Sequence, residues 1–104
     1  MAAPVDIGTL IERTPGVVGG RPRIAGRRLT VRNIAGMHNA GDPPEEILRQ
    51  YPQLSLAEVH AALAYYYANQ AEIDEDIAEE ARFYDEMAKQ YPPLRDREPD
   101  PAAR

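Results

Sequence analysis

The chain has 104 residues, a formal net charge of −5 and no cysteine, and 43% of its residues are hydrophobic. This length allows one domain with a single modest core, and the missing cysteines exclude disulfides, thiolate metal sites and cysteine nucleophiles. Because the N-terminus lacks a signal peptide pattern and no apolar run approaches the roughly 20 residues of a membrane helix, we expect a soluble, cytoplasmic protein without membrane contacts.

Residues 1–15 form a mixed N-terminal segment in which "IGTLIE" can make a single helical turn. From Gly16 the pattern changes to short apolar pairs between glycines, in "GVVGG", "PRIAG" and "RLTV". These pairs are too short and too rich in glycine for a helix, so they predict two or three short strands joined by tight turns. Pro22 fits the start or edge of a strand. The sequence leaves open whether these strands pair within one chain or between two.

Three helix starts follow in quick succession. Thr30 can cap a helix that carries Val31, Ile34 and Met37 on one face and ends at residues 40–41. The stretch "DPPE" begins with the acidic cap Asp42, continues with proline and has Glu45 three residues on, the pattern of a capping box, so it predicts a helix that stops before Pro52. Ser55 begins "SLAE", a second capping box. After this box, apolar residues recur at spacings of three and four: Leu56, Val59, Leu63 and Tyr66.

The run from Ser55 to Tyr91 contains neither proline nor glycine. We expect a break near Asn69, because asparagine tolerates the left-handed conformation that ends helices. The second part, roughly 70–90, places apolar residues on one stripe and acidic residues on its other faces. The members of this stripe are Ile73, Ile77, Ala81, Tyr84, Ala88 and Tyr91.

These elements predict a mainly α fold with short N-terminal β-strands. After the segment 1–15, residues 16–68 form the strands and a trihelical unit whose last two helices have helix-turn-helix spacing. Residues 69–91 form an acidic amphipathic helix, and residues 92–104, which contain four prolines, form a flexible tail.

Charge divides unevenly along the chain. Residues 13–41, the basic segment, carry six arginines and neither Asp nor Glu, whereas residues 61–91 carry Arg82 and Lys89 against eight acidic residues. Arginine forks suit phosphates, and phosphate contacts supply most non-specific DNA affinity. An arginine-rich solvated surface without a partner is the alternative interpretation. The candidate DNA-binding residues are Arg21, Arg23, Arg27, Arg28, Arg32 and Ser55.

The helix that begins at Ser55 would be the recognition helix of a DNA-binding module. Its first two turns contain no Arg, Lys, Asn or Gln, which is a poor set for reading base edges. The helix-turn-helix can therefore be a scaffold, with the arginines making the DNA contacts.

The C-terminal helix carries more apolar surface than a small trihelical core can bury. A spare apolar helix face is typical of a protein–protein surface, and we prefer this interpretation to an intramolecular lid. The candidate partner-binding residues are Tyr67, Ile73, Ile77, Tyr84, Met87 and Tyr91.

No residue pattern predicts an enzyme. Neither His38 nor His60 has neighbours with metal-ligand spacing, and the carboxylates of "EIDEDIAEE" are typical of a solvated helix face. No nucleophile triad, glycine-rich phosphate loop or acid pair stands out. We expect no catalytic residues, no metal and no cofactor.

Residues 16–74 resemble the domain-of-unknown-function-433 family. The matching features are a G-[KR]-P-x-[IV]-x-G start at residues 20–26, "PEEIL", "YP-L", and "ALAYY" leading into "EID". Where the family commonly has Gly-Thr-Arg, this chain has Gly26, Arg27 and Arg28.

The resemblance implies a helix-turn-helix antitoxin of a type II toxin–antitoxin module, similar to VapB-type proteins. It implies a homodimer that binds double-stranded operator DNA through its N-terminal part, and a C-terminal helix that neutralises a PIN-like ribonuclease toxin. The alternative is a protein-interaction adaptor whose helix-turn-helix is structural and binds no DNA.

Overall fold

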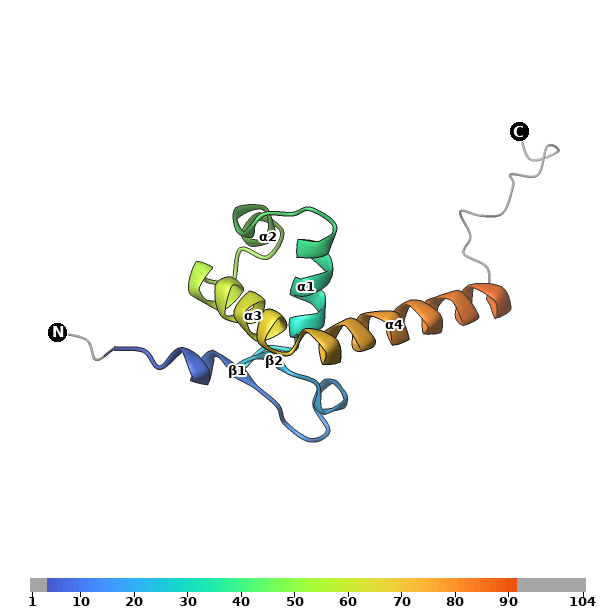
Figure 1. Ribbon diagram of the computed structural model, residues 1–104, viewed down its shortest axis with the longest axis horizontal. Helices are drawn as coiled ribbons and strands as arrows, with labels where there is room; N and C mark the ends of the chain where they lie inside the picture. The colour runs from blue at the N-terminus through green and yellow to red at the C-terminus, as the bar shows by residue number, and fades with distance from the viewer. Residues whose placement is uncertain (1–3, 92–104) are drawn as a thin grey trace.

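The computed structural model describes residues 4–91. Three helices form a cluster, a small two-stranded sheet lies beside it, and a fourth helix projects away from it (Figure 1). The elements in chain order are η1 (Ile7–Leu10), β1 (Ile11–Glu12), η2 (Val18–Gly20), β2 (Arg23–Ile24), α1 (Val31–Asn39), α2 (Pro44–Gln50), α3 (Leu56–Ala68) and α4 (Gln70–Gln90). The expected mainly α fold with short N-terminal strands is confirmed, and the expected tail at 92–104 lies outside the described residues.

The strands β1 and β2 pair antiparallel within one chain, with Ile11 opposite Ile24. Pro22 directly precedes β2, as expected, and is buried. The prediction of a strand in "GVVGG" was wrong, because this stretch forms the 3₁₀ turn η2. Gly19 and Gly20 there have φ angles of 68° and 73°. These values belong to the left-handed region, which ends extended structure.

The predicted cap at Thr30 and the predicted capping box at Ser55 are present, and Thr30 forms a full capping box with Asn33, whereas no capping box forms at Asp42. Thr30 accepts a hydrogen bond from the Asn33 N–H at 3.1 Å, and the Asn33 side chain accepts one from the Thr30 N–H at 3.0 Å. Ser55 and Glu58 make the same reciprocal pair at 3.1 and 2.8 Å. Each box satisfies N–H groups that have no partner inside the helix, which is why α1 and α3 begin where the sequence predicts.

The start of α2 differs from the prediction by one residue. Pro43, not Asp42, is the N-cap, and Pro44 is the first helical residue. Asp42 instead closes α1, because its N–H donates to the Met37 carbonyl at 3.1 Å while Gly41 holds a φ of 102°. This arrangement is a Schellman-type end, in which the acid after the glycine belongs to the preceding helix.

The core lies where α1, α2 and α3 meet and includes β2 and the start of α4. Leu56 was expected on the buried stripe of α3 but is 44% exposed, whereas Leu54, two residues earlier, is buried in the core. The buried hydrophobic residues are Ile24, Val31, Ile34, Ala35, Ile47, Leu54, Val59, Ala62, Leu63, Tyr66 and Ile73.

The helix break predicted near Asn69 separates α3 from α4. Asn69 has φ −132° and ψ 42°, so it is not in the left-handed conformation expected from its type. Its N–H and its side-chain Nδ2 both donate to the Tyr65 carbonyl, at 3.0 and 3.1 Å, and these bonds close α3. The chain then turns into α4 without a glycine.

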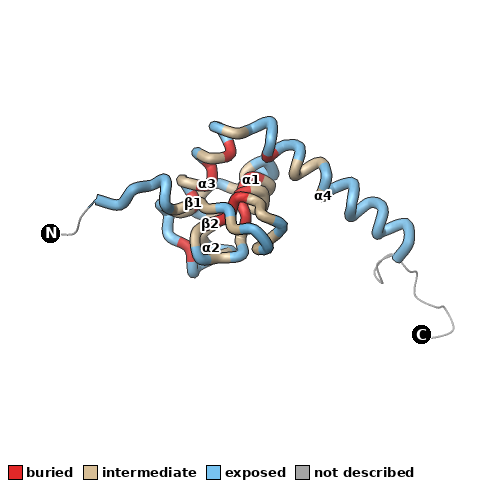
Figure 2. Tube along the Cα trace, turned by 90° about the horizontal axis from the view of Figure 1, so that it is seen from below, coloured by how far each residue is buried: buried red, intermediate tan, exposed pale blue. Residues whose placement is uncertain are grey.

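Only the first half of α4 packs against the rest of the fold. Ile73 is fully buried and Ile77 is half-buried, whereas residues 81–91, the free end of α4, are all exposed (Figure 2). No helix within residues 4–91 is long and apolar enough to cross a membrane.

Candidate functional site

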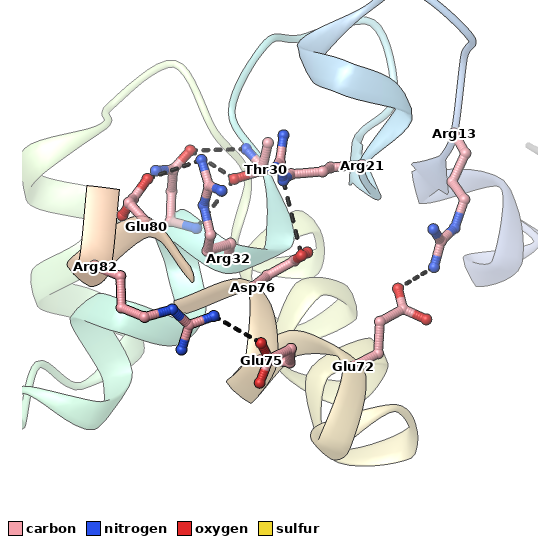
Figure 3. Close-up of polar contacts among 10 residues, drawn as sticks. Arg13, Arg21, Thr30, Arg32, Glu72, Glu75, Asp76, Glu80 and Arg82 are labelled. Carbon is pink, nitrogen blue, oxygen red and sulfur yellow. Dashed lines mark hydrogen bonds and ion pairs between the residues drawn. The ribbon is translucent and has the colours of Figure 1, made fainter. Parts of the chain in front are cut away.

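The basic segment folds against α4, and three of its arginines meet three acids of that helix (Figure 3). The acids are spaced by four residues, which places them on one face of the helix. We call Glu72, Asp76 and Glu80 the acid row. The pairs are Arg13 with Glu72, Arg21 with Asp76 at 3.8 Å, and Arg32 with Glu80 at 2.8 Å.

Two further arginines have partners outside α4. Arg23 is buried, and its guanidinium lies 2.6 Å from the Glu12 carboxylate and donates to the Arg27 carbonyl at 2.7 Å. Arg27 lies 3.4 Å from Glu58 and donates to the Gln53 carbonyl at 2.7 Å. These contacts tie the turn after β2 to β1 and to the first turn of α3.

Arg28 is the exception among the basic-segment arginines. It is exposed and forms no ion pair with any residue between 4 and 91. Of the predicted DNA-binding arginines, Arg28 alone therefore presents its charge without a carboxylate beside it. Arg21, Arg23, Arg27 and Arg32 would have to exchange a carboxylate for a phosphate in order to bind DNA.

The helix-turn-helix pair α2–α3 presents few cations. Its only Arg or Lys is Arg49, whose Nε lies 2.7 Å from a carboxylate oxygen of Glu46. The predicted site residue Ser55 is the N-cap of α3, where its hydroxyl accepts from the Glu58 N–H. Ser55 therefore has a structural role as the N-cap of α3, and α3 itself carries no Arg or Lys that could contact DNA beside it.

The predicted partner-binding residues fall into two groups. Ile73 lies in the core and is not free to contact a partner, whereas Ile77 packs against the core and is half-buried. Tyr84, Met87 and Tyr91 lie on the free end of α4, with exposed fractions of 64%, 36% and 69%. They continue the stripe of Ile73 and Ile77 beyond the edge of the core.

Tyr67 lies apart from this stripe, on α3. It is exposed, and its hydroxyl is 2.5 Å from the His38 Nε2, which joins α3 to the end of α1. The structure does not bring Tyr67 together with the residues of the free end of α4.

Sequence reasoning missed Phe83, which is 59% exposed on the free end of α4 and packs edge-on against Tyr84 with ring centroids 5.8 Å apart. The signal was available, because Phe83 is four residues before Met87 and adjoins the apolar stripe. It also missed Glu79, which together with Phe83 lines a cleft between α4 and the rest of the fold.

A polar network joins α1, α3 and α4 at the root of the projecting helix. The Tyr66 hydroxyl donates to Asp74 at 2.7 Å and accepts from the Asn39 side chain at 3.1 Å. The hydrogen bond to the Asp74 carboxylate raises the pKa of Tyr66, because ionised Tyr66 would lose this bond and face a like charge.

We predict that this network loses stability at alkaline pH. The pKa of Tyr66 is higher in the folded than in the unfolded state. Its hydrogen bond therefore contributes fully to the free energy of unfolding below about pH 10, and this contribution is lost as the pH rises through the folded-state pKa. At neutral pH, Tyr66→Phe should cost about 0.5–1.5 kcal/mol for the lost hydrogen bond. Urea unfolding from pH 8 to pH 11 should show this difference shrinking above pH 10. A difference that stays constant across this range would contradict the prediction.

Comparison with protein-family models matches residues 11–66 to the family described as "Protein of unknown function (DUF433)". A solved structure is also similar, the crystal structure of a DUF433 member protein from Anabaena variabilis ATCC 29413. The two chains are 38% identical, the match covers 67% of this chain and 69% of that chain, and the TM-score is 0.64. No curated protein matches this chain.

Proposed function

The chain belongs to the DUF433 family, and from this premise we propose that it is an antitoxin of a type II toxin–antitoxin module. It neutralises a PIN-like ribonuclease through α4. The observation that carries the proposal is the free end of α4, residues 81–91, which is exposed along its whole length (Figure 2) and bears large apolar side chains that the fold leaves uncovered.

The free end of α4 has the features of a helix that binds in a groove. Its large apolar side chains sit three and four residues apart, as anchors do in helix-in-groove complexes. They gather in one short exposed segment, whereas apolar residues scattered singly on a surface would need no partner. The anchors are Phe83, Tyr84, Met87 and Tyr91.

The charge of this helix indicates a basic partner. From Glu79 to Tyr91, α4 carries four acidic residues against Arg82 and Lys89. An acidic helix is attracted to the cationic path along which a ribonuclease holds RNA phosphates. The antitoxin would then compete with RNA for the same cationic groups. A second copy of this acidic helix would be repelled by the same charges.

Binding of operator DNA by a homodimer is a second proposal. The exposed Arg28 favours it, because it lies in the turn that Arg27 ties to the start of α3. Phosphate contacts need such an accessible cation. The arginine–carboxylate pairs give this activity weaker support than the uncovered helix gives to partner binding. A protein-interaction adaptor that binds no duplex is the alternative.

The test is neutralisation of a PIN-like ribonuclease, which the proposal requires the neighbouring gene to encode. Deletion after Asn69 is too severe, because it would remove Ile73 from the core. A chain that ends at Ala81 keeps Ile73 and Ile77, and a chain that ends at Tyr91 is the matched control. We expect the control to restore growth and inhibit RNA cleavage as the full chain does, and the shorter chain to do neither. Full neutralisation by the chain that ends at Ala81 would refute the proposal.

A further inference from the structure

A cleft of about 260 Å³ opens where α4 leaves the core. Its walls come from the approach to β2, from the start of α1 and from two turns of α4. Figure 3 shows three of the lining side chains, those of Arg21, Arg32 and Glu80. The complete lining is Arg21, Arg32, Glu79, Glu80, Phe83 and Tyr84.

The two arginines of the cleft are already engaged. Arg21 faces Asp76 and Arg32 faces Glu80, so each guanidinium charge has a carboxylate beside it. Their Nε atoms have no hydrogen-bond partner within residues 4–91, but both are buried beneath the surface, out of reach of an occupant. An anion at this site would therefore have to compete with Asp76 and Glu80 for the two guanidinium charges, and it would find no accessible Nε–H.

The charge that remains in the cleft is negative. Glu79 is exposed and forms no ion pair within the described part of the chain. Counting Asp76, three carboxylates surround two guanidinium groups. Charge complementarity therefore favours a cationic occupant.

The two aromatic side chains of the cleft, Phe83 and Tyr84, also favour a cation. Phe83 and Tyr84 are 59% and 64% exposed, and their ring planes lie at 72° to each other. A cation within about 6 Å of an aromatic ring face is attracted by the ring quadrupole. Arginine suits such a wall better than lysine, because its planar guanidinium can stack on a ring while its N–H groups reach a carboxylate.

We infer that this cleft receives an arginine side chain of the protein that binds α4, with Glu79 accepting its N–H groups and Phe83 and Tyr84 holding its plane. The inference rests on the proposed function and specifies the partner, which must present an arginine beside the groove that holds Tyr84 and Met87. The cleft and the apolar anchors then belong to one continuous interface.

The occupant can be tested without the partner, by NMR titration of the isotope-labelled full chain with N-acetyl-arginine amide. The citrulline analogue has nearly the same shape without the charge, and inorganic phosphate tests for an anion. We expect arginine-dependent shifts at Glu79, Phe83 and Tyr84. Glu79→Gln should weaken the binding about 2- to 5-fold, the range for one exposed ion pair, and Phe83→Ala should also weaken it. Glu86→Gln, the same charge change on an exposed residue that does not line the cleft, should leave it unchanged.

Three outcomes would overturn the inference: equal shifts with citrulline, shifts with phosphate but not arginine, or the same effect from Glu79→Gln as from Glu86→Gln. These outcomes are distinct from failure of the proposed function. If the chain that ends at Ala81 neutralises the ribonuclease, the antitoxin role of the free end of α4 is wrong even when arginine binds the cleft. If the chain that ends at Ala81 fails to neutralise the ribonuclease and the cleft does not bind arginine, the proposed function stands and only the inferred occupant of the cleft is wrong.

Discussion

Replacing Ile73 by alanine is expected to destabilise the fold by about 2–5 kcal/mol, the cost of a cavity at a fully buried isoleucine. Ile73 is the buried residue of α4, and it packs into the same core as Val59, Leu63 and Tyr66. Because a small domain is stable by only about 5–15 kcal/mol, a loss of this size would remove a large part of the stability that keeps α4 attached to the core.

The matched control is Tyr84→Ala, on the same stripe of α4 but 64% exposed. Its free energy of unfolding should change by less than about 0.5–1 kcal/mol, as for other surface substitutions. Urea unfolding monitored by circular dichroism measures both variants. Similar small losses in the two variants would show that α4 is not docked in solution, and the pairs between the acid row and the arginines would then not form.

Ile73→Ala and Tyr84→Ala should also differ in their effects on partner binding. Tyr84→Ala removes an anchor of the proposed interface and should weaken binding of the proposed ribonuclease partner while the fold persists. Ile73→Ala should affect binding only as far as it unfolds the chain. The stripe that the sequence presents as one surface therefore has two roles, and the boundary lies near Ala81, where burial ends.

Local signals predicted the helices well, because their causes lie within a few residues. Thr30 and Asn33, like Ser55 and Glu58, satisfy each other's N–H groups across one turn, so the pattern alone places the helix start. Where two local signals competed, the prediction failed. Asp42 could begin α2 or end α1, and the left-handed Gly41 before it decided the outcome.

The arrangement of the site could not be predicted in the same way. The sequence shows an arginine-rich segment and an acidic helix, and we interpreted them as surfaces for two different partners. In the structure they lie against each other, and Arg32 pairs with Glu80 although the two are far apart in the sequence. Such pairing depends on the direction in which α4 leaves Asn69, which no local pattern determines. The sequence shows the two opposite charges, but it does not show that they contact each other.

The pairs between the arginines and the acid row also imply that α4 lowers the affinity of the basic segment for DNA. We predict that the triple variant Glu72→Gln/Asp76→Asn/Glu80→Gln binds duplex DNA more tightly than the unmodified chain. Removing the acid row leaves Arg13, Arg21 and Arg32 without their carboxylates. If two or three phosphates replace them, binding should weaken roughly 10- to 40-fold between 50 and 200 mM salt, from a slope of about 0.9 per phosphate.

The matched control changes three other acids of the same helix, in Glu79→Gln/Asp85→Asn/Glu86→Gln. Its net charge equals that of the first variant, but these acids form no ion pair within residues 4–91. Fluorescence anisotropy against the DNA upstream of the gene and an unrelated duplex, at both salt concentrations, measures the effect. A gain in the first variant alone means that the acid row masks a DNA-binding surface. Equal gains in DNA affinity in both triple variants would mean that the effect comes from net charge alone. Absence of binding in every variant would leave the adaptor as the explanation, because the arginines would then serve only to hold α4 in place.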